Sequence, residues 1–379
     1  MTKKLCIFPN DPLILYFEKG EIKDRYFNPN NFFDEIHIIS FIEKDVEEEK
    51  VQNLAGNATL KIYSVGKINF FNKITKKNEI LKIIKEIQPD VIRSYNSLIQ
   101  GWVAAYCCKK LQIPFYVSLH VQYDGLRNMI KHKNLKKYLA LKYSRKNIEP
   151  FVLKNADKIT IVYKIIQPYV EQLSDKIPEI LYNRIDLKRF SEGQKKIIFD
   201  KPLILSVGRL TAQKNHIELI KAIEGLDVLL MIIGYGELRD ELTELVKKLK
   251  IEKKVIFKKM VPNNKIQDYY NSADVFVLPY NPNIEGLPIP VLEAMASKLP
   301  VIIPHPIPGL SDGLENAVSF TKIEPKSIEK EISRIINDPE YSNMLATNAL
   351  KKSDEFDGEI SESREEEIYK ELLINQEKS

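Results

Sequence analysis

Two glutamates, Glu285 and Glu293, form a carboxylate pair that could bind hydroxyl groups. Glu285 comes just before an expected helix at 289–297, and Glu293 lies eight residues further along the chain, about two turns later. The first N–H groups of a helix have no intrahelical partner and favour an anion. A phosphate at the helix tip with a sugar beside it would use both carboxylates as hydrogen-bond acceptors.

Two cations follow a different apolar run. Arg209 comes directly after an expected strand at 203–207, and Lys214 lies five residues later, at the start of an expected helix. Positive charges fixed at one strand edge can stabilise negative charge that develops on a leaving group. Taken singly, Arg209 could be a structural ion-pair residue and Lys214 a solvated lysine.

Short apolar runs alternate with helical patterns over most of the chain, which predicts an α/β fold with parallel sheets. The first half has six expected strands, at 5–8, 35–39, 61–65, 91–94, 115–119 and 158–162. The second half has five, at 203–207, 228–233, 255–257, 275–278 and 301–303. Sheets of this kind bind ligands beyond the carboxyl ends of their strands.

Five motifs in order give the chain a resemblance to a known family. They are Ser206-Val-Gly-Arg-Leu210, Lys214-Asn215, Gly234-Tyr-Gly236, Ser272-Ala-Asp274, and Glu285-x7-Glu293 followed by Ala294-Met-Ala296. Together they resemble the GT-B glycosyltransferases, in particular the large retaining family 4. The resemblance is dense from about residue 182 to 320 and thin before about residue 89.

The resemblance implies two doubly wound, Rossmann-like domains facing a central cleft. We expect an acceptor domain at 1–185, completed by a C-terminal helix at about 358–376, and a nucleotide-sugar donor domain at 186–357. The link between them departs from the family pattern, because Tyr182 and Arg184 stand where the family has Pro and Gly.

The resemblance also implies roles for individual residues. In the catalytic set, Arg209 and Lys214 bind the diphosphate, and Glu285 lies near the hydroxyls of the donor sugar. Glu293 accepts hydrogen bonds from the ribose. The remaining donor contacts are glycines and backbone groups: Gly208, Gly234, Met260, Val261, Gly286 and Leu287. The cations take the place of a metal, so we expect no metal and no cofactor besides the nucleotide-diphosphate sugar.

The first half carries the weaker candidates. His120 ends the strand at 115–119 and resembles the family histidine that contacts the donor sugar, although Val121 to Asp124 depart from the common pattern after it. Arg93, Tyr95 and Asn96, at the end of another strand, are candidate acceptor contacts. The Gly-Gly loop that often follows the first strand is absent, which predicts unusual acceptor recognition.

Composition limits the partners. The net charge of +5 is mild and does not indicate nucleic acid. Cys6, Cys107 and Cys108 have no metal-ligand spacing and are expected to be reduced thiols. We expect no signal peptide and no membrane span, since no apolar run approaches the roughly 18 to 20 residues required. The predicted location is cytoplasmic, with peripheral contact at the inner face of the membrane as an open alternative.

That membrane contact is predicted from the 127–158 stretch, which has ten Lys and Arg against two acids. Leu135, Tyr138, Leu139 and Lys142 are expected on one helical face. A basic amphipathic helix can lie on anionic lipid. A solvated surface helix is the alternative.

The sequence therefore predicts a retaining, metal-independent transferase that moves a sugar from a nucleotide-diphosphate sugar to a glycan or lipid-linked acceptor. Retention would proceed by same-face transfer, because Glu285 has no obvious carboxylate partner. Two alternatives stay open. One is a non-hydrolysing sugar-nucleotide 2-epimerase on the same fold. The other is a non-catalytic module that binds a sugar-nucleotide.

Overall fold

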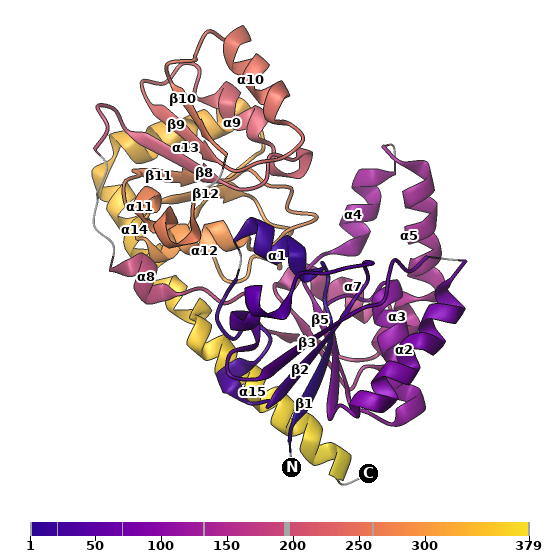
Figure 1. Ribbon diagram of the computed structural model, residues 1–379. Coiled ribbons are helices and arrows are strands. Elements are labelled where there is room, and N and C mark those ends of the chain that lie inside the picture. Colours follow the sequence, from indigo (N-terminus) through magenta and orange to yellow (C-terminus); the bar gives the residue numbers. More distant parts are fainter. Residues whose placement is uncertain are drawn as a thin grey trace. The chain divides into compact units, whose positions relative to one another are not determined.

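The computed structural model describes residues 2–20, 22–69, 71–131, 133–192, 198–259 and 261–377. The chain divides into two compact units, which are coloured along the sequence in Figure 1. Unit 1 comprises Met1–Tyr182 with Ser361–Ser379, and unit 2 comprises Asn183–Ile360. Each unit contains one sheet, and every strand pair in both sheets is parallel, as predicted.

The sheet of unit 1 has seven strands in the order β3-β2-β1-β4-β5-β6-β7. The strands are β1 (Lys4–Phe8), β2 (Glu35–Ser40), β3 (Thr59–Ser64), β4 (Val91–Ser94), β5 (Phe115–Leu119), β6 (Lys158–Ile161) and β7 (Glu179–Ile180). The helices are α1 (Leu13–Lys19), α2 (Lys73–Ile87), α3 (Ile99–Leu111), α4 (Tyr123–Ile130), α5 (Leu135–Asn147), α6 (Glu149–Asn155) and α7 (Gln167–Glu171). The last helix, α15 (Gly358–Glu377), begins in unit 2 and belongs to unit 1 from Ser361 onward.

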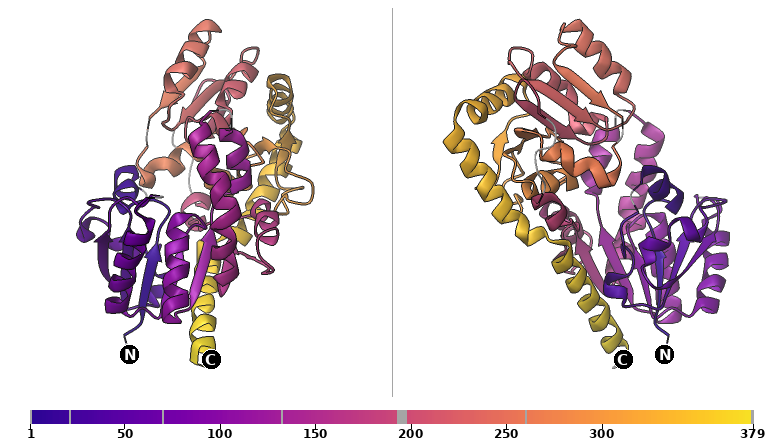
Figure 2. Two further views of the ribbon diagram at one scale, coloured as in Figure 1. Left: turned by 90° about the vertical axis from the view of Figure 1, so that its right-hand side faces the viewer. Right: turned by 60° about the vertical axis from the view of Figure 1, so that its left-hand side comes forward.

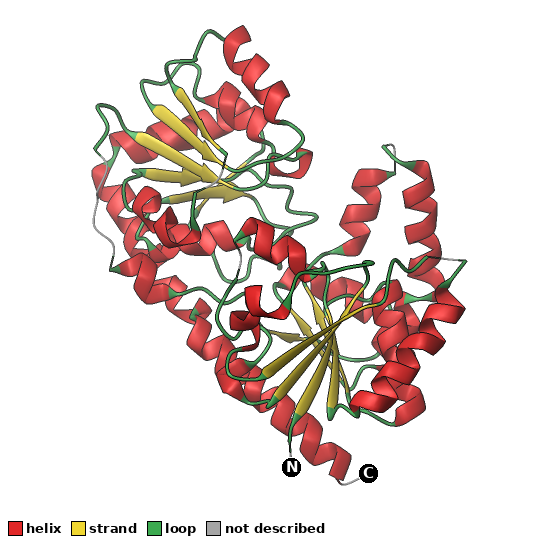
Figure 3. Ribbon diagram, viewed as in Figure 1, coloured by secondary structure: helices red, strands yellow, loops and turns green. Residues whose placement is uncertain are grey.

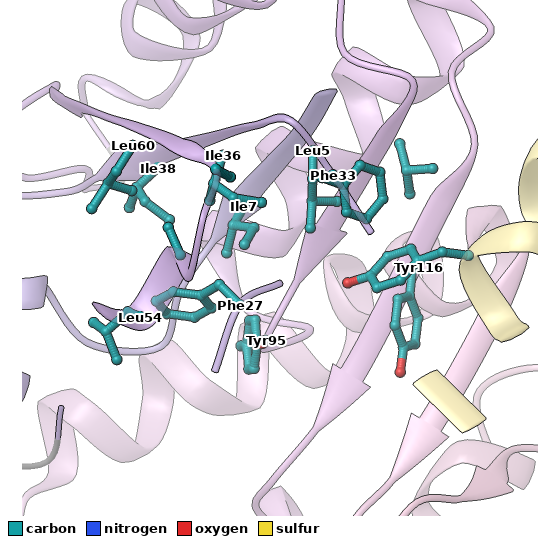
Figure 4. Packing of buried hydrophobic residues seen from close by; sticks show 14 of the residues in the cluster. Leu5, Ile7, Phe27, Phe33, Ile36, Ile38, Leu54, Leu60, Tyr95 and Tyr116 are labelled. Atoms are coloured by element: carbon teal, nitrogen blue, oxygen red, sulfur yellow. The ribbon is translucent and has the colours of Figure 1, made fainter. Parts of the chain in front are cut away.

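The core of unit 1 forms because its strands are apolar on both faces, as expected for a parallel sheet covered on both sides. On one face, Leu5 and Ile7 of β1 and Ile36 and Ile38 of β2 pack with buried aromatic side chains (Figure 4). Three apolar residues of α15 complete the same cluster: Ile368, Tyr369 and Leu372. The C-terminal helix therefore supplies part of the hydrophobic core of the N-terminal sheet.

The sheet of unit 2 has six strands in the order β10-β9-β8-β11-β12-β13. They are β8 (Leu203–Val207), β9 (Leu229–Ile233), β10 (Val255–Lys258), β11 (Val275–Val277), β12 (Val301–Pro304) and β13 (Ser319–Thr321). The helices are α8 (Leu187–Ser191), α9 (His216–Ala222), α10 (Arg239–Lys248), α11 (Ile266–Tyr270), α12 (Ile289–Ala296), α13 (Pro325–Asn337) and α14 (Pro339–Ser353). Helices and strands of each unit alternate along the chain (Figure 3).

In both sheets the order in which the strands follow one another reverses at one point. This point lies between β1 and β4 in unit 1 and between β8 and β11 in unit 2. Ligands of doubly wound sheets bind beyond the carboxyl ends of the strands at such a switch point. A ligand site in unit 2 is therefore expected at the loops that follow β8 and β11. None of the helices in the described part of the chain combines the length and the apolarity that crossing a bilayer requires.

Candidate functional site

Two glycines, Gly234 and Gly236, let the loops after β8 and β9 meet backbone to backbone. Gly234 has a φ of +155°, and a Cβ there would lie 1.9 Å from the carbonyl oxygen of Gly208. A Cβ at Gly236 would lie 2.4 Å from the carbonyl oxygen of Leu210. The N–H of Leu210 donates to the carbonyl of Tyr235 at 2.8 Å. A side chain at position 234 or 236 would push apart the two loops that form the base of the site.

The segment that carries Lys214 is tied to the loop after β11. Residues Ala212–Lys214 form one 3₁₀ turn, and Asn215 adopts a left-handed conformation with φ of 50°, so α9 begins only at His216. The Nδ2 of Asn215 donates to the carbonyl of Pro279 at 2.8 Å. The carbonyl of Gln213 accepts from the N–H of Asn281 at 2.7 Å. Lys214 therefore ends a turn that precedes the helix, instead of opening the helix as the sequence predicted.

These ties bring Lys214 and Glu285 into an ion pair at the switch point. The Nζ of Lys214 lies 2.5 Å from Oε2 of Glu285, with the two side chains 7% and 16% exposed. The other carboxylate oxygen accepts from Nε2 of Gln213 at 2.6 Å. Both oxygens of Glu285 thus have a donor, which fixes the position of the carboxylate.

Arg209 lies beside this pair but is exposed. A Cβ at Gly208 would be 3.6 Å from Cε of Lys214, so the Lys214 side chain passes next to the residue that precedes Arg209. Among the described residues, no acid and no carbonyl binds the guanidinium of Arg209. The site therefore offers one cation paired with Glu285 and one cation that is open to an anionic ligand.

The backbone after Glu285 offers further donors. The N–H groups of Gly286 and Leu287 donate to no acceptor within the part of the chain that the structure describes. They lie three and two residues before Ile289, the first residue of α12, near the positive end of the helix dipole. The carbonyl of Gly286 is held by the hydroxyl of Tyr280 at 2.5 Å. Burial, with the nearby Glu285 charge, raises the pKa of Tyr280, so this hydroxyl stays protonated and donates.

Glu293 belongs to a second polar contact, separate from Glu285. It lies on α12, and its Oε2 accepts from the hydroxyl of Tyr270 at 2.7 Å. Tyr270 is fully buried, and its ring packs edge to face on Phe190 with centroids 5.6 Å apart. Burial and then the Glu293 charge raise the pKa of Tyr270. The contact links the end of α11 to α12 and orients Glu293.

The remaining predicted donor contacts lie in the loop after β10. Val261 is half-buried and lies three residues after the end of that strand. Met260 lies outside the described residues. Their predicted role in binding the base rests on the family resemblance alone.

In unit 1, His120 follows β5 as predicted. Its ring stacks on Tyr95 with centroids 5.3 Å apart, and its carbonyl accepts from the hydroxyl of Tyr163 at 2.8 Å. Its Nε2 is buried without a hydrogen-bond partner. Burial and then the Arg93 charge lower the pKa of His120 to about 4, so the ring is neutral at pH 7.

The three expected acceptor contacts are all buried inside unit 1. The guanidinium of Arg93 pairs with Glu365 and donates to the hydroxyls of Tyr369 and Ser118, both at 3.0 Å. The Oδ1 of Asn96 accepts from the N–H of Leu98 at 3.0 Å, at the start of α3. Tyr95 packs among aromatic rings. This geometry gives all three residues structural roles, because none of them presents an exposed side chain.

Sequence reasoning missed Gln213, Tyr270 and His216. Gln213 adjoins Lys214, but nothing local shows that its side chain reaches Glu285. His216 is buried on the inner face of α9, and neither ring nitrogen has a hydrogen-bond partner. Burial and then the Lys214 charge lower the pKa of His216 to about 3. Because His216 lies one helical turn before Leu219 and Ile220, the helical spacing could have predicted that it is buried on the same face.

Within the described residues, no group of three His, Cys, Asp or Glu side chains is arranged to hold a metal ion. The three cysteines are unpaired and buried, and burial raises the pKa of each thiol.

Comparison with known families finds a match within unit 2. The family described as glycosyl transferases group 1 matches residues 188–352, which include every site residue of unit 2 discussed above. Over these residues the chain is similar to the glycosyl transferases group 1 family.

Proteins similar to this chain come from several microorganisms. The uncharacterized glycosyltransferase MJ1607 of Methanocaldococcus jannaschii is 32% identical over 204 residues, which are 52% of this chain and 49% of that protein. The putative teichuronic acid biosynthesis glycosyltransferase TuaC of Bacillus subtilis is 30% identical over 59% of this chain and 55% of its own length. The chain thus spans about half the length of these two relatives.

A third relative is matched over more of its length. It is the UDP-Gal:alpha-D-GlcNAc-diphosphoundecaprenol alpha-1,3-galactosyltransferase of Escherichia coli, 25% identical over 72% of this chain and 73% of that protein.

Several solved structures share the fold of this chain. The sucrose-phosphate synthase of Thermosynechococcus elongatus superposes with a TM-score of 0.73 at 14% identity, over 98% of this chain and 100% of that one. The Anabaena protein Alr3699/HepE in complex with UDP superposes with a TM-score of 0.71 at 14% identity, over 98% and 100% of the two chains. These matches confirm the GT-B fold predicted for this chain.

Proposed function

We propose that this chain transfers a sugar from a nucleotide-diphosphate sugar to a glycan or lipid-linked acceptor, with retention at the anomeric carbon. The observation that carries the proposal is the group of charges at the switch point of unit 2. There, the buried Lys214–Glu285 pair lies beside the exposed Arg209 and the open N–H groups before α12. Such a site supplies positive charge for a diphosphate and a fixed carboxylate for sugar hydroxyls.

In the proposed reaction, the bond between the anomeric carbon and the β-phosphate oxygen breaks as the acceptor oxygen bonds to the same face of the sugar. Negative charge grows on the leaving phosphate, and Arg209 and Lys214 stabilise it. The acceptor hydroxyl gives its proton to the leaving phosphate. Glu285 orients the sugar through its hydroxyls, and His120, neutral at pH 7, is the proposed further hydrogen-bond partner of the sugar.

The other donor contacts follow from the same placement. Glu293 is the proposed acceptor for the ribose hydroxyls, and the Gly286 and Leu287 amides are proposed to bind the sugar or the phosphate. Gly208 and Gly234 have no side chain, and this is proposed to let the diphosphate approach the backbone of the two loops closely. Structural neighbours have been solved with UDP and with UDP-glucose, which supports a nucleotide-sugar donor for this chain.

We further propose that the acceptor is a glycan or lipid-linked saccharide reached at an anionic membrane surface, which would make the chain a cytoplasmic, peripheral protein. The name of the Escherichia coli relative specifies an acceptor linked to diphosphoundecaprenol, and that name supports the lipid-linked class. No nucleic acid partner is proposed.

A panel of nucleotide-sugars tested by thermal shift identifies the donor. A ligand at 100 times its dissociation constant adds about 2.7 kcal/mol to the free energy of unfolding, which raises the melting temperature measurably. The stabilising donor is then incubated with and without candidate acceptors. Transfer only with acceptor is the expected result. Interconversion of the donor sugar without any acceptor would identify an epimerase, and stabilisation without either reaction would identify a binding module.

A further inference from the structure

Two acid-free segments of unit 1 carry exposed apolar side chains among cations. Residues 131–148, which contain α5, have seven Lys or Arg and no Asp or Glu. Residues 67–77, which lead into α2, have four Lys and no acid. Large exposed apolar side chains are uncommon on a soluble surface, and a group of them marks an interaction site.

The outward face of α5 combines both kinds of side chain. Leu135, Leu139 and Tyr143 are 65%, 54% and 45% exposed. At about 100° per residue they fall within an arc of about 80° on the helix. Lys142 and Lys146, both exposed, fall at the same side of the helix, and Lys136 lies at the edge of the arc. The apolar row and the cations therefore share one face.

The opposite side of α5 is held against the rest of unit 1. The buried Arg127 of α4 donates from Nε to the carbonyl of Leu141 at 3.0 Å and pairs with Asp124 and with the buried Glu149. Arg145 donates to Asp124 at 3.0 Å and to Gln172 at 2.9 Å. The helices α4 and α5 lie side by side in both views of Figure 2.

These contacts correct the expected membrane face. Tyr138 is half-buried, and Arg127 and Arg145 are engaged inside the unit, so they do not contribute to the outer surface. Tyr143 belongs to that surface instead.

The second segment presents its apolar residues from a fixed turn. The Oδ1 of Asn69 accepts from the N–H groups of Phe71 and Asn72 at 2.8 and 3.1 Å, and Nδ2 of Asn72 donates to the carbonyl of Lys67. Phe71 is 95% exposed and Ile74 is 60% exposed. The ammonium of Lys73 lies 5.6 Å from the ring centroid of Tyr143, which places this turn next to α5.

We infer that the outer face of α5 and the 67–77 turn form one surface that binds anionic lipid. The cations contact the headgroups, and Phe71, Ile74 and the α5 row enter the interface between headgroups and acyl chains. The inference deepens the membrane contact proposed above and rests on it. It does not depend on sugar transfer, because lipid binding is measured without a donor.

Two features favour a lipid surface as the occupant. Cations interspersed among apolar side chains, with no acid in either segment, complement a layer that is anionic outside and apolar below. The apolar side chains come from two separate elements, α5 and the turn that leads into α2, whereas a partner helix would need one groove to receive it.

The test is co-sedimentation with vesicles of phosphatidylcholine alone or mixed with phosphatidylglycerol, at low and high salt. The wild type should bind the anionic vesicles at low salt and be released by salt. Changing Lys136, Lys142 and Lys146 to Gln should weaken anionic binding about a hundredfold, since each cation near the surface contributes on the order of a fivefold gain. The Phe71→Ser, Ile74→Ser variant should bind about tenfold more weakly at every salt concentration.

Matched controls remove the same chemistry elsewhere in unit 1. Lys44, Lys85 and Lys110 changed to Gln carry the same change in charge, and Ile177→Ser removes a side chain that is 86% exposed. Both controls should bind as the wild type does.

Each contrary outcome has its own meaning. Absence of wild-type binding to anionic vesicles overturns the membrane contact itself, while sugar transfer in solution would remain. Wild-type binding with an unchanged Phe71/Ile74 variant overturns the two-element surface alone. A dimer that the same variants dissociate in analytical ultracentrifugation, without vesicle binding, would make this face an interface between copies of the chain.

Discussion

The two units share one sheet order but use their switch points differently. In unit 2, the switch between β8 and β11 is lined by Arg209, Lys214 and Glu285, and it keeps one cation and two N–H groups open. In unit 1, the switch between β1 and β4 is followed by Tyr95 and Asn96, which are buried. The same topology thus holds a ligand site in one unit and a packed polar core in the other.

The difference lies in what the charged residues near each switch point bind. Arg93 of unit 1 is saturated by Glu365, Tyr369 and Ser118, with aromatic rings on both sides at 4.3 and 4.6 Å. Arg209 of unit 2 is exposed and has no such partner within the described residues. A switch point can therefore bind a ligand only where the neighbouring side chains leave charged groups accessible.

The largest expected effect is on the stability of unit 1. Arg93→Met should lower its free energy of unfolding by about 3 to 5 kcal/mol, because Glu365 is left buried without its cation. The single tryptophan, Trp102, lies on α3 of unit 1, so its fluorescence in urea reports this unit. Arg93→Met with Glu365→Leu should recover part of the loss. A single variant as stable as the wild type would show that the pair does not stabilise the core.

Next in size is the effect on turnover of the charges in unit 2. Arg209→Ala and Lys214→Ala should each lower kcat by roughly 10² or more, the cost of removing one preorganised charge from the leaving group. The melting temperature of Arg209→Ala should not change, since the side chain is exposed. Lys221→Ala, on the surface of α9, is the matched control. Near-wild-type turnover of both variants with saturating donor would contradict the proposed site.

The third prediction concerns the stability of unit 2 at low pH. His216 has a pKa of about 3 in the folded state, against an ordinary value of about 6.5. Between these values the unfolded state binds more protons, so stability falls as pH drops through this window. From pH 7 to pH 4.5 the loss should be about 2 to 3 kcal/mol for unit 2. His216→Leu should remove it in urea titrations followed by circular dichroism, while the Trp102 transition keeps its own dependence on His120. Equal acid sensitivity in His216→Leu would disprove the assignment.

A smaller effect separates sugar binding from nucleotide binding. Gln213→Ala removes one donor from Glu285 and should lower kcat/KM for the donor about tenfold, the scale of one hydrogen bond to a charged group. Affinity for the nucleoside diphosphate alone should stay constant, because Glu285 is proposed to contact only the sugar. Calorimetry with both ligands tests this, with Gln267→Ala as control. An equal loss of affinity for both ligands would indicate a general distortion of the loop.

The smallest expected effect is that of metal removal. Because Arg209 and Lys214 are proposed to supply the positive charge, activity should be unchanged in EDTA. A loss of activity that magnesium or manganese restores would show that the cations are insufficient.

Much of the fold could be predicted, because each predicted strand is an apolar run long enough to show its pattern. The strands β7 (Glu179–Ile180) and β13 (Ser319–Thr321) were missed because each is short and has a single apolar residue, so neither forms an apolar run. Contacts were harder to predict than elements. Lys214 and Glu285 are 71 residues apart and meet only because β8 and β11 are neighbours, which no local pattern encodes.

The same limit explains the residues with unexpected roles. Arg93 was a candidate for ligand binding because it is a cation at a strand end. Its partner Glu365 lies on a helix 272 residues away. The three residues that sequence reasoning missed act through buried contacts, and burial is a property of the assembled fold.

The position of α15 in the chain has a consequence for synthesis. Glu365, Ile368, Tyr369 and Leu372 leave the ribosome after all of unit 2, yet they complete the core that begins at β1. At 5 to 20 residues per second, Arg93 waits roughly 15 to 50 seconds for the partner that lies 272 residues downstream. During this time the nascent N-terminal sheet has an uncovered apolar face. Unit 1 should therefore mature only after unit 2 has been synthesised, and a nascent chain stalled before residue 361 should be a substrate for chaperones.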